Sequence, residues 1–243
     1  MYPILHQLLS DKKGGKVFEL FGPWHFFYIA LTLAVIAVVL RKTKGEDGER
    51  TAKGFSDLAF GLYILDFFLM PLAYGEIDVE KLPFHACTAM CVLCFLSWRV
   101  DFLERYRSSL AMLGFVSNLV YLIYPAGVMW HGVHPLSYRV VQTLVFHGVM
   151  TVSCFLAVLY ERGEGRGRRD LIVIVGMTAW ALLGNYCYNN DARFFNWFFV
   201  VRDPFCILPE AAAPFVMPVL NIALFFTVEV VLRQVFLRVK RML

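Results

Sequence analysis

Residues 138–160, YRVVQTLVFHGVMTVSCFLAVLY, form a long apolar stretch whose one charged side chain, Arg139, lies at its start. About 20 mostly apolar residues in an α-helix, rising about 1.5 Å each, cross the roughly 30 Å of hydrocarbon in a bilayer. The stretch therefore predicts a membrane-spanning helix. It also carries a histidine, His147, nine residues inside the predicted span.

The rest of the chain has the same character. Of its 243 residues, 59% are hydrophobic and 16% aromatic, more apolar surface than a soluble domain of this size can bury. We predict an all-α, polytopic integral membrane protein, a single transmembrane domain over residues 1–243. Residues 1–18 lack an apolar core, so no cleaved signal peptide is expected. The seven expected spans are 20–40, 55–74, 83–98, 108–126, 138–160, 170–188 and 212–237, of which the third is short.

Basic residues predict the orientation of this bundle. Alternate connections hold 16 of the 23 Lys and Arg residues, namely 41–53, 99–107, 161–169 and the tail after 232. Cytoplasmic connections carry such an excess, which predicts an N-out, C-in arrangement in a bacterial plasma membrane. The net charge of +4 therefore reflects topology and not nucleic-acid binding. The arginine-rich segment 162–169 is typical of an anchor beside anionic lipid.

The longest outer connection, 189–211, is too polar and too interrupted by proline to span the membrane, yet rich in aromatic residues. We expect an interfacial helix or a re-entrant cap, with Trp197 at headgroup level. Pro209, Pro214 and Pro218 predict a kinked or broken start to the seventh span.

Polar side chains gather in the outer half of the predicted bundle. Because polar groups inside a membrane need partners or water, this distribution predicts a polar cavity open to the outer side. The simpler explanation, that helix ends are wetter than helix centres, covers His25, His131 and His134 but not His147. The residues concerned are the six histidines, Asn118, Asn185, Tyr186, Asn221, Cys87, Cys187 and Cys206.

A reactive thiol is predicted at the start of the third span, in Leu82-Pro83-Phe84-His85-Ala86-Cys87. Pro83 suits the first turn of a helix, which places Cys87 near the positive end of the helix dipole. That position favours a thiolate, and free N–H groups there can receive an oxyanion. The alternative is a small buried residue on one helical face with Cys91 and Cys94.

His147 is the natural partner of Cys87, because a Cys–His pair within hydrogen-bonding reach is typical of covalent acyl transfer. The alternative is a buried histidine bonded to a neighbouring helix. His85 lies about 200° around a helix from Cys87, so the two face one point only where the helix starts between them. His85 is therefore expected to orient a headgroup or cover the site.

Metal binding is a weaker hypothesis, since His85, Cys87, His131 and His134 match no compact zinc pattern. No metal and no cofactor is predicted. A Cys187–Cys206 disulfide is compatible with an oxidising outer compartment.

Asp66 and Glu229 are acids inside the second and seventh predicted spans. Glu229 is expected to pair with Arg233 four residues later. Asp66 has three interpretations: a buried hydrogen-bonded group, a third catalytic member or a proton relay.

Taken together, these residues resemble the YwaF-type family of bacterial membrane proteins over nearly the whole chain. That family is similar to a eukaryotic cysteine-dependent acyltransferase of ether phospholipids, and more distantly to androgen-induced hydrolases of fatty-acid esters. The resemblance implies Cys87 as acyl-accepting nucleophile and His147 as general base; Ala86 stands where relatives often have a larger apolar residue. The matching pieces are residues 21–25, 82–87, 124–127, 134–135, 146–148 and 185–186.

The favoured hypothesis is a lipid-modifying enzyme that transfers or hydrolyses a phospholipid acyl ester, with membrane lipids as partners. One alternative is a non-catalytic transporter or ligand-binding protein with Asp66 and the outer histidines along its path. Another is a structural subunit that needs a partner protein. The residues expected to position substrate are His85, Asn118, Asn185, Tyr186, Asp66 and His25.

Overall fold

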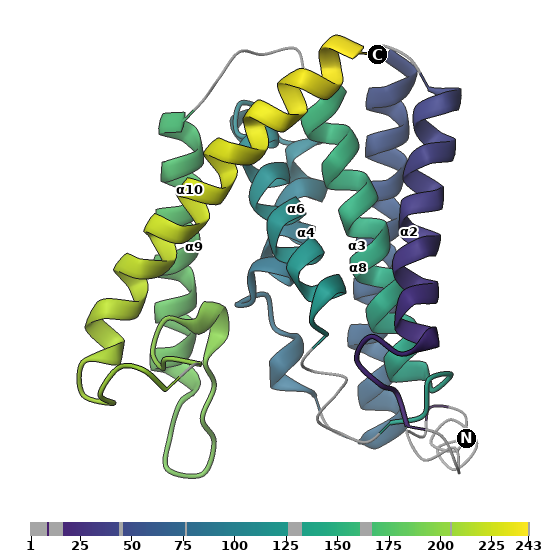
Figure 1. The fold of residues 1–243 in the computed structure, drawn as a ribbon. Coiled ribbons are helices and arrows are strands. Elements are labelled where there is room, and N and C mark those ends of the chain that lie inside the picture. The colour runs from purple at the N-terminus through teal and green to yellow at the C-terminus, as the bar shows by residue number, and fades with distance from the viewer. Residues whose placement is uncertain are drawn as a thin grey trace.

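The computed structural model describes Leu9 and residues 17–43, 46–75, 77–125, 133–160, 167–204 and 206–242. Within these ranges the regular structure is helical, apart from a single β-bridge between Asn190 and Arg193. The long helices lie side by side in a bundle (Figure 1). The all-α prediction is therefore confirmed.

The helices follow one another up and down the bundle. The bundle end where α2, α4, α8 and α10 begin also carries residues 189–211, which we name the cap, and is called the cap end (Figure 1). The opposite end is called the basic end. The longer helices are α2 (Pro23–Lys42), α3 (Glu46–Tyr74), α4 (Ala86–Ser97), α6 (Arg107–Ile123), α8 (Tyr138–Tyr160), α9 (Gly167–Tyr188) and α10 (Ala213–Met242), and the short ones are η1 (Val79–Lys81), α5 (Asp101–Glu104) and η2 (Trp197–Phe199).

Five helices are long and apolar enough to cross a membrane: α2, α3, α8, α9 and α10. Helices α4 and α6 are apolar but shorter, with 12 and 17 residues. At about 1.5 Å per residue they fall short of the roughly 30 Å hydrocarbon core. Five of the seven predicted spans thus coincide with helices able to cross a membrane, and the other two, α4 and α6, stay a prediction.

Helix α8 forms the centre of the bundle. In its most apolar window 67% of the residues are buried, against 17% in α2 and in α10. It packs against α3 on one side and α6 on another, and its Leu144, Met150 and Leu156 side chains belong to the core. Helices α2 and α10 expose most of their apolar surface, as is expected of helices that face lipid.

The cap is fixed to the bundle by amide side chains. Asn185 of α9 donates to the Trp197 carbonyl and accepts from the Trp197 N–H, both at 3.1 Å. Asn221 of α10 donates to the carbonyls of Phe198 and Phe199, two residues with left-handed backbone. Trp197 is 0% exposed and packs inside the protein, and its place at headgroup level stays a prediction.

Helix α10 departs from two predictions. Its helical structure continues through Pro218, so the seventh helix is not broken there, and a kink at this residue stays a prediction. Pro214 lies in its first turn, where a missing N–H costs no helical hydrogen bond. The expected Glu229–Arg233 pair is absent, since Arg233 binds Asp170 of α9 instead, at 2.5 Å.

We predict that the close approach of α9 to Phe84 tolerates no added side-chain atom at Gly184. A Cβ there would overlap the Phe84 ring, which itself packs against Trp180 and Trp197. Overpacking of this kind costs about 1–3 kcal/mol, so Gly184→Ala should lower the Tm of the detergent-solubilised protein. Gly176→Ala on the same helix is the matched control, because its Cβ would meet nothing within 4 Å. Equal Tm values for the two variants would contradict this packing.

Candidate functional site

Cys87 is the second residue of α4. The helix begins at Ala86 with His85 as its N-cap, and the first helical bond runs from Ala89 to the His85 carbonyl. The half-buried thiol therefore lies among the free amide groups at the positive end of the helix.

The predicted place of Pro83 in the first turn is wrong. The chain turns before the helix, with the Phe84 N–H bonded to the Leu82 carbonyl. The Pro83 carbonyl instead accepts from the Trp180 indole at 2.7 Å. Consequently Cys87 lies closer to the helix start than expected. The helix also starts between His85 and Cys87, which is the one arrangement that lets both side chains face a common site.

His147 has one ring nitrogen engaged and one without a partner. Its Nδ1 lies 2.7 Å from the Thr143 carbonyl, and because a carbonyl only accepts, Nδ1 carries the proton. Nε2 then holds a lone pair, and this buried atom has no hydrogen-bond partner. The ring stacks on Tyr121 with centroids 3.8 Å apart, which fixes its orientation. An oriented imidazole with a free lone pair is what a general base requires.

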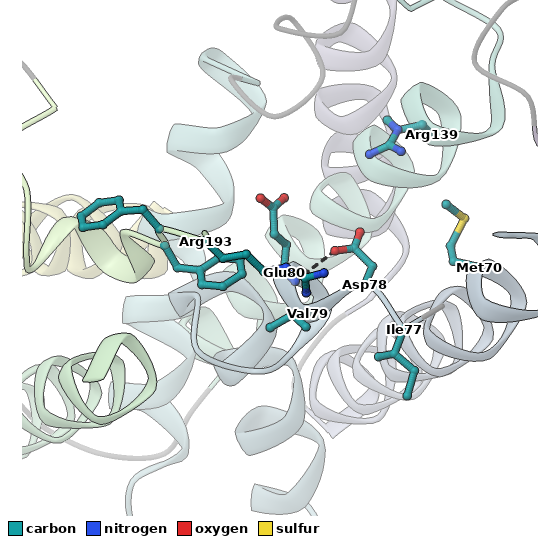
Figure 2. A pocket seen from close by; sticks show the side chains of 9 residues that line it. Met70, Ile77, Asp78, Val79, Glu80, Arg139 and Arg193 are labelled. Atoms are coloured by element: carbon teal, nitrogen blue, oxygen red, sulfur yellow. Dashed lines mark hydrogen bonds between the residues drawn. The ribbon is translucent and has the colours of Figure 1, made fainter. Parts of the chain in front are cut away.

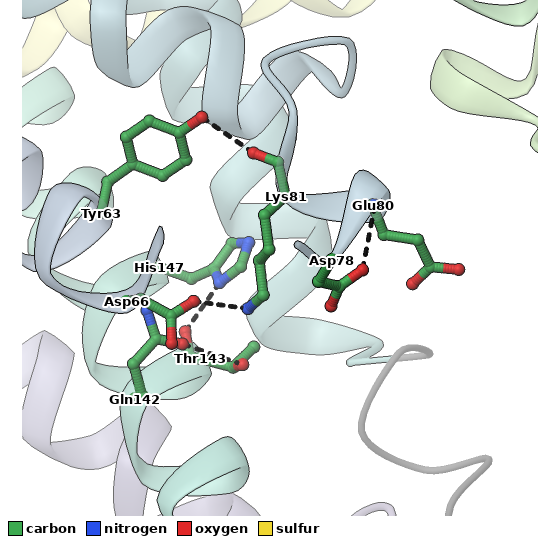
Figure 3. A network of polar contacts seen from close by, with 8 residues as sticks. All are labelled: Tyr63, Asp66, Asp78, Glu80, Lys81, Gln142, Thr143 and His147. Atoms are coloured by element: carbon green, nitrogen blue, oxygen red, sulfur yellow. Dashed lines mark hydrogen bonds and ion pairs between the residues drawn. The ribbon is translucent and has the colours of Figure 1, made fainter. Parts of the chain in front are cut away.

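A buried ion pair lies beside this histidine. Lys81 Nζ is 2.6 Å from the carboxylate of Asp66, which is 2% exposed within α3. Tyr138 of α8 also hydrogen-bonds this carboxylate, and Tyr63 donates to the Lys81 carbonyl at 2.8 Å. Figure 3 shows the Lys81 side chain directed toward Asp66 and His147. Asp66 is thus a buried, bonded group, as the first of its three interpretations held.

Lys81 links the two proposed reactive groups. Its ammonium acts electrostatically on both Cys87 and His147, and His85 acts on His147 as well. No hydrogen bond joins the thiol to His147, since Nε2 is unpartnered and Nδ1 is on Thr143. In the sequence, Lys81 stands out only as a basic residue in the connection between the predicted spans 55–74 and 83–98. The available signal was the otherwise unpaired acid, Asp66, in a neighbouring span.

The remaining predicted site residues have mainly structural contacts. His25 uses both ring nitrogens, accepting from the Phe21 N–H and contacting the Leu122 carbonyl at 2.6 Å. Asn185 holds the cap, as described above. Asn118 donates to the Gly114 carbonyl of its own helix, and its buried Oδ1 has no partner. Tyr186 is 87% exposed and points away from the bundle interior.

The suggested disulfide and the metal hypothesis both concern cysteine and histidine side chains. Cys187 and Cys206 are both free thiols, so the suggested disulfide is not formed. Across the described ranges, no group of three or more His, Cys, Asp or Glu side chains is arranged to hold a metal ion. His131, one member of the metal set considered above, lies outside those ranges.

A polar cavity of about 430 Å³ opens at the cap end, between the end of α3, η1, the start of α8 and the cap. It brings together two acids, Asp78 and Glu80, and two arginines, Arg139 and Arg193 (Figure 2). In Figure 3, Asp78 and Glu80 point away from Lys81, so η1 separates this cavity from the ion pair. The apolar part of the lining is Met70, Ile77, Val79, Phe194 and Phe195.

The cap covers the start of α4 from the side of α9. The Trp197 ring lies 4.9 Å from Phe84 and 4.5 Å from Phe195 between centroids, and His85 meets its edge at 6.5 Å. The N-terminus of α4 is therefore enclosed by aromatic rings on this side. Its polar neighbours come from α3, η1 and α8.

Comparison with known proteins assigns the chain to a family. No curated protein and no solved structure matches it. The family model described as "TMEM164 family" matches residues 12–236, nearly the whole chain, including every residue of the site described above. Together with five helices able to cross a membrane, this match shows an integral, multi-pass membrane protein that belongs to the TMEM164 family.

Proposed function

We propose that this protein is a lipid-modifying enzyme that transfers or hydrolyses a phospholipid acyl ester, with Cys87 as nucleophile and His147 as general base. The observation that carries the proposal is the buried, unpartnered Nε2 of His147, whose ring is held by Thr143 and Tyr121. A thiol at a helix N-terminus lies at the same end of the bundle. The resemblance to YwaF-type proteins and to a cysteine-dependent acyltransferase supports the same chemistry.

The reaction proceeds in two halves. As the Cys87 sulfur attacks the ester carbonyl, Nε2 of His147 takes the thiol proton, which matters because burial disfavours a free thiolate. The tetrahedral oxyanion is met by amide N–H groups at the start of α4. Collapse expels the lysolipid alkoxide, which takes the proton from His147 and leaves a thioester. A lysolipid hydroxyl or water then attacks the thioester by the reverse proton path, and the sulfur regains its proton.

Substrate binding brings the thiol to Nε2. Catalytic hydrogen bonds are often long in an enzyme without substrate and tighten in the complex. Cys87 lies in the first turn of a short helix, so a change of its side-chain rotamer or of that turn redirects the sulfur. His85, as the N-cap of the same helix, is the positioning residue of this movement.

The headgroup occupies the cavity at the cap end. Its two arginines suit a phosphate, since guanidinium groups bind phosphate through paired hydrogen bonds. Its acids, Asp78 and Glu80, suit an amine on the same headgroup. In this proposal α4 and α6 complete seven spans, the N-terminus is outside, and the site faces the outer leaflet of a bacterial plasma membrane, as the distribution of basic residues predicts.

We predict that covalent labelling by an activity-based acyl probe depends on Cys87 and His147. Cys87→Ala should abolish the adduct, and His147→Gln should slow labelling by about 10²-fold or more, as loss of a general base does. Cys91→Ala, one turn further along α4, is the matched control and should label as wild type. Labelling that persists in Cys87→Ala would sink the acyl-enzyme and favour the non-catalytic alternative.

The Asp66–Lys81 pair is expected to support both stability and chemistry. Lys81→Met leaves a buried carboxylate unpaired and should cost about 3–5 kcal/mol, read as a lower Tm. The double variant Asp66→Leu/Lys81→Met should recover most of that loss while acyl-probe labelling stays low, because Lys81 no longer faces Cys87 and His147.

The control for this pair is Arg202→Met, which breaks an exposed ion pair with Glu210. Such a surface pair contributes about 0–1 kcal/mol, so Tm should hardly change. If Lys81→Met and Arg202→Met had equal Tm, the buried pair would not be structural. If the double variant labelled as fast as wild type, Lys81 would have no part in the site.

A further prediction concerns the headgroup cavity. Arg193→Gln should raise KM for a phospholipid substrate about tenfold and leave kcat near wild type, because a remote contact contributes to binding and not to the chemical step. Arg50→Gln, an exposed arginine at the basic end, should change neither constant. A fall in kcat with unchanged KM would show that Arg193 acts in the chemistry and not in headgroup binding.

A further inference from the structure

Glu229 of α10 is a buried carboxyl group without a partner. Its residue is 0% exposed, and neither carboxyl oxygen has a hydrogen-bond partner. It lies sixteen residues after Ala213, the first residue of α10, which at about 1.5 Å per residue is about 24 Å from the cap end, so it takes no part in the chemistry proposed for Cys87 and His147. A lone buried acid within a membrane helix is costly and is retained for a use.

The nearby arginine is already committed. Arg233 donates from Nε and Nη2 to the two oxygens of Asp170 in α9, each at 2.5 Å, and from Nη1 to the Ser108 hydroxyl of α6 at 3.1 Å. Asp170 is 1% exposed, so this forked pair is also buried. The fork satisfies one carboxylate fully and leaves Glu229 outside it.

The charges around Glu229 determine its protonation state. Asp170 and Arg233 neutralise each other, so an ionised Glu229 would add an uncompensated negative charge close to Asp170. Asp170 of α9 and Arg233 of α10 are the charged groups that act on Glu229. An unpaired buried carboxylate costs far more than taking up a proton.

We propose that Glu229 is a proton-binding site: a neutral carboxylic acid in the packed bundle, which on losing its proton competes with Asp170 for Arg233. The ligand is H⁺, and the exchange is Glu229–COOH to Glu229–COO⁻ plus H⁺. Because α6, α9 and α10 meet at Arg233, a change of partner alters the contact between these helices. The site is independent of the acyl chemistry and stands or falls without it.

The test is modification of the full-length protein, in neutral detergent, by dicyclohexylcarbodiimide. This apolar reagent adds a carboxylic acid O–H across its C=N bond and requires the protonated acid. Peptide mass spectrometry should find the adduct on Glu229 at neutral pH, decreasing as the pH rises, and absent in Glu229→Gln. Asp66 and Asp170 are internal controls, since they are as deeply buried but ion-paired. A recovered but unmodified Glu229 peptide, or equal adducts on the paired acids, would overturn the proposal.

The competition between Glu229 and Asp170 for Arg233 is tested by a separate variant. Asp170→Asn frees the guanidinium to pair with Glu229, which then ionises, so the Glu229 adduct should fall about tenfold or more. An undiminished adduct would refute the exchange of partners. Glu229→Gln mimics the neutral acid and should keep the wild-type Tm, whereas Arg233→Gln should lower it. If both variants lowered Tm equally, Glu229 would be ionised in the native state and the proposal would be wrong.

Discussion

The ion pair between Asp66 and Lys81 is the contact on which the cap end of the molecule depends. A carboxylate buried within a membrane helix is stable only beside a counter-charge, and this one is supplied by the connection that follows α3. The chain must therefore fold back into the bundle soon after leaving α3. Tyr63 holds the same point by its bond to the Lys81 carbonyl. The start of α4, and with it Cys87, is placed by this return.

A short α4 is the direct consequence. Its first residue, Ala86, is buried in the bundle. Free amide groups at such a place are tolerated only beside polar partners or a cavity. The neighbouring helix α8 presents His147 with its proton fixed on Nδ1 and its other nitrogen open. Lys81 is the group that acts electrostatically on both the thiol of Cys87 and the imidazole of His147.

Much of the helical framework could be predicted from sequence, because each span is encoded locally by its own apolar run. The stretch 138–160 coincides with α8, and the burial of His147 follows from its depth in that run. What could not be predicted depends on the path of connections between helices. The pairing of Lys81 with Asp66 depends on how the connection after α3 folds back. Trp197 is of a residue type common at membrane interfaces, yet it lies in the core.

Charge neutrality inside the bundle explains the two buried ion pairs and also the unpaired Glu229. A guanidinium binds a carboxylate best through two parallel hydrogen bonds, and Arg233 of α10 attains this geometry with Asp170 of α9. Arg233 therefore pairs with Asp170 and not with Glu229, which lies four residues before it in the chain. In the described helices, the buried acids Asp66 and Asp170 are paired with Lys81 and Arg233. In our proposal the third buried acid, Glu229, binds a proton instead. At the cap end Lys81 neutralises Asp66. His147 can therefore stay neutral, and a neutral imidazole with a free nitrogen is the form that accepts a proton.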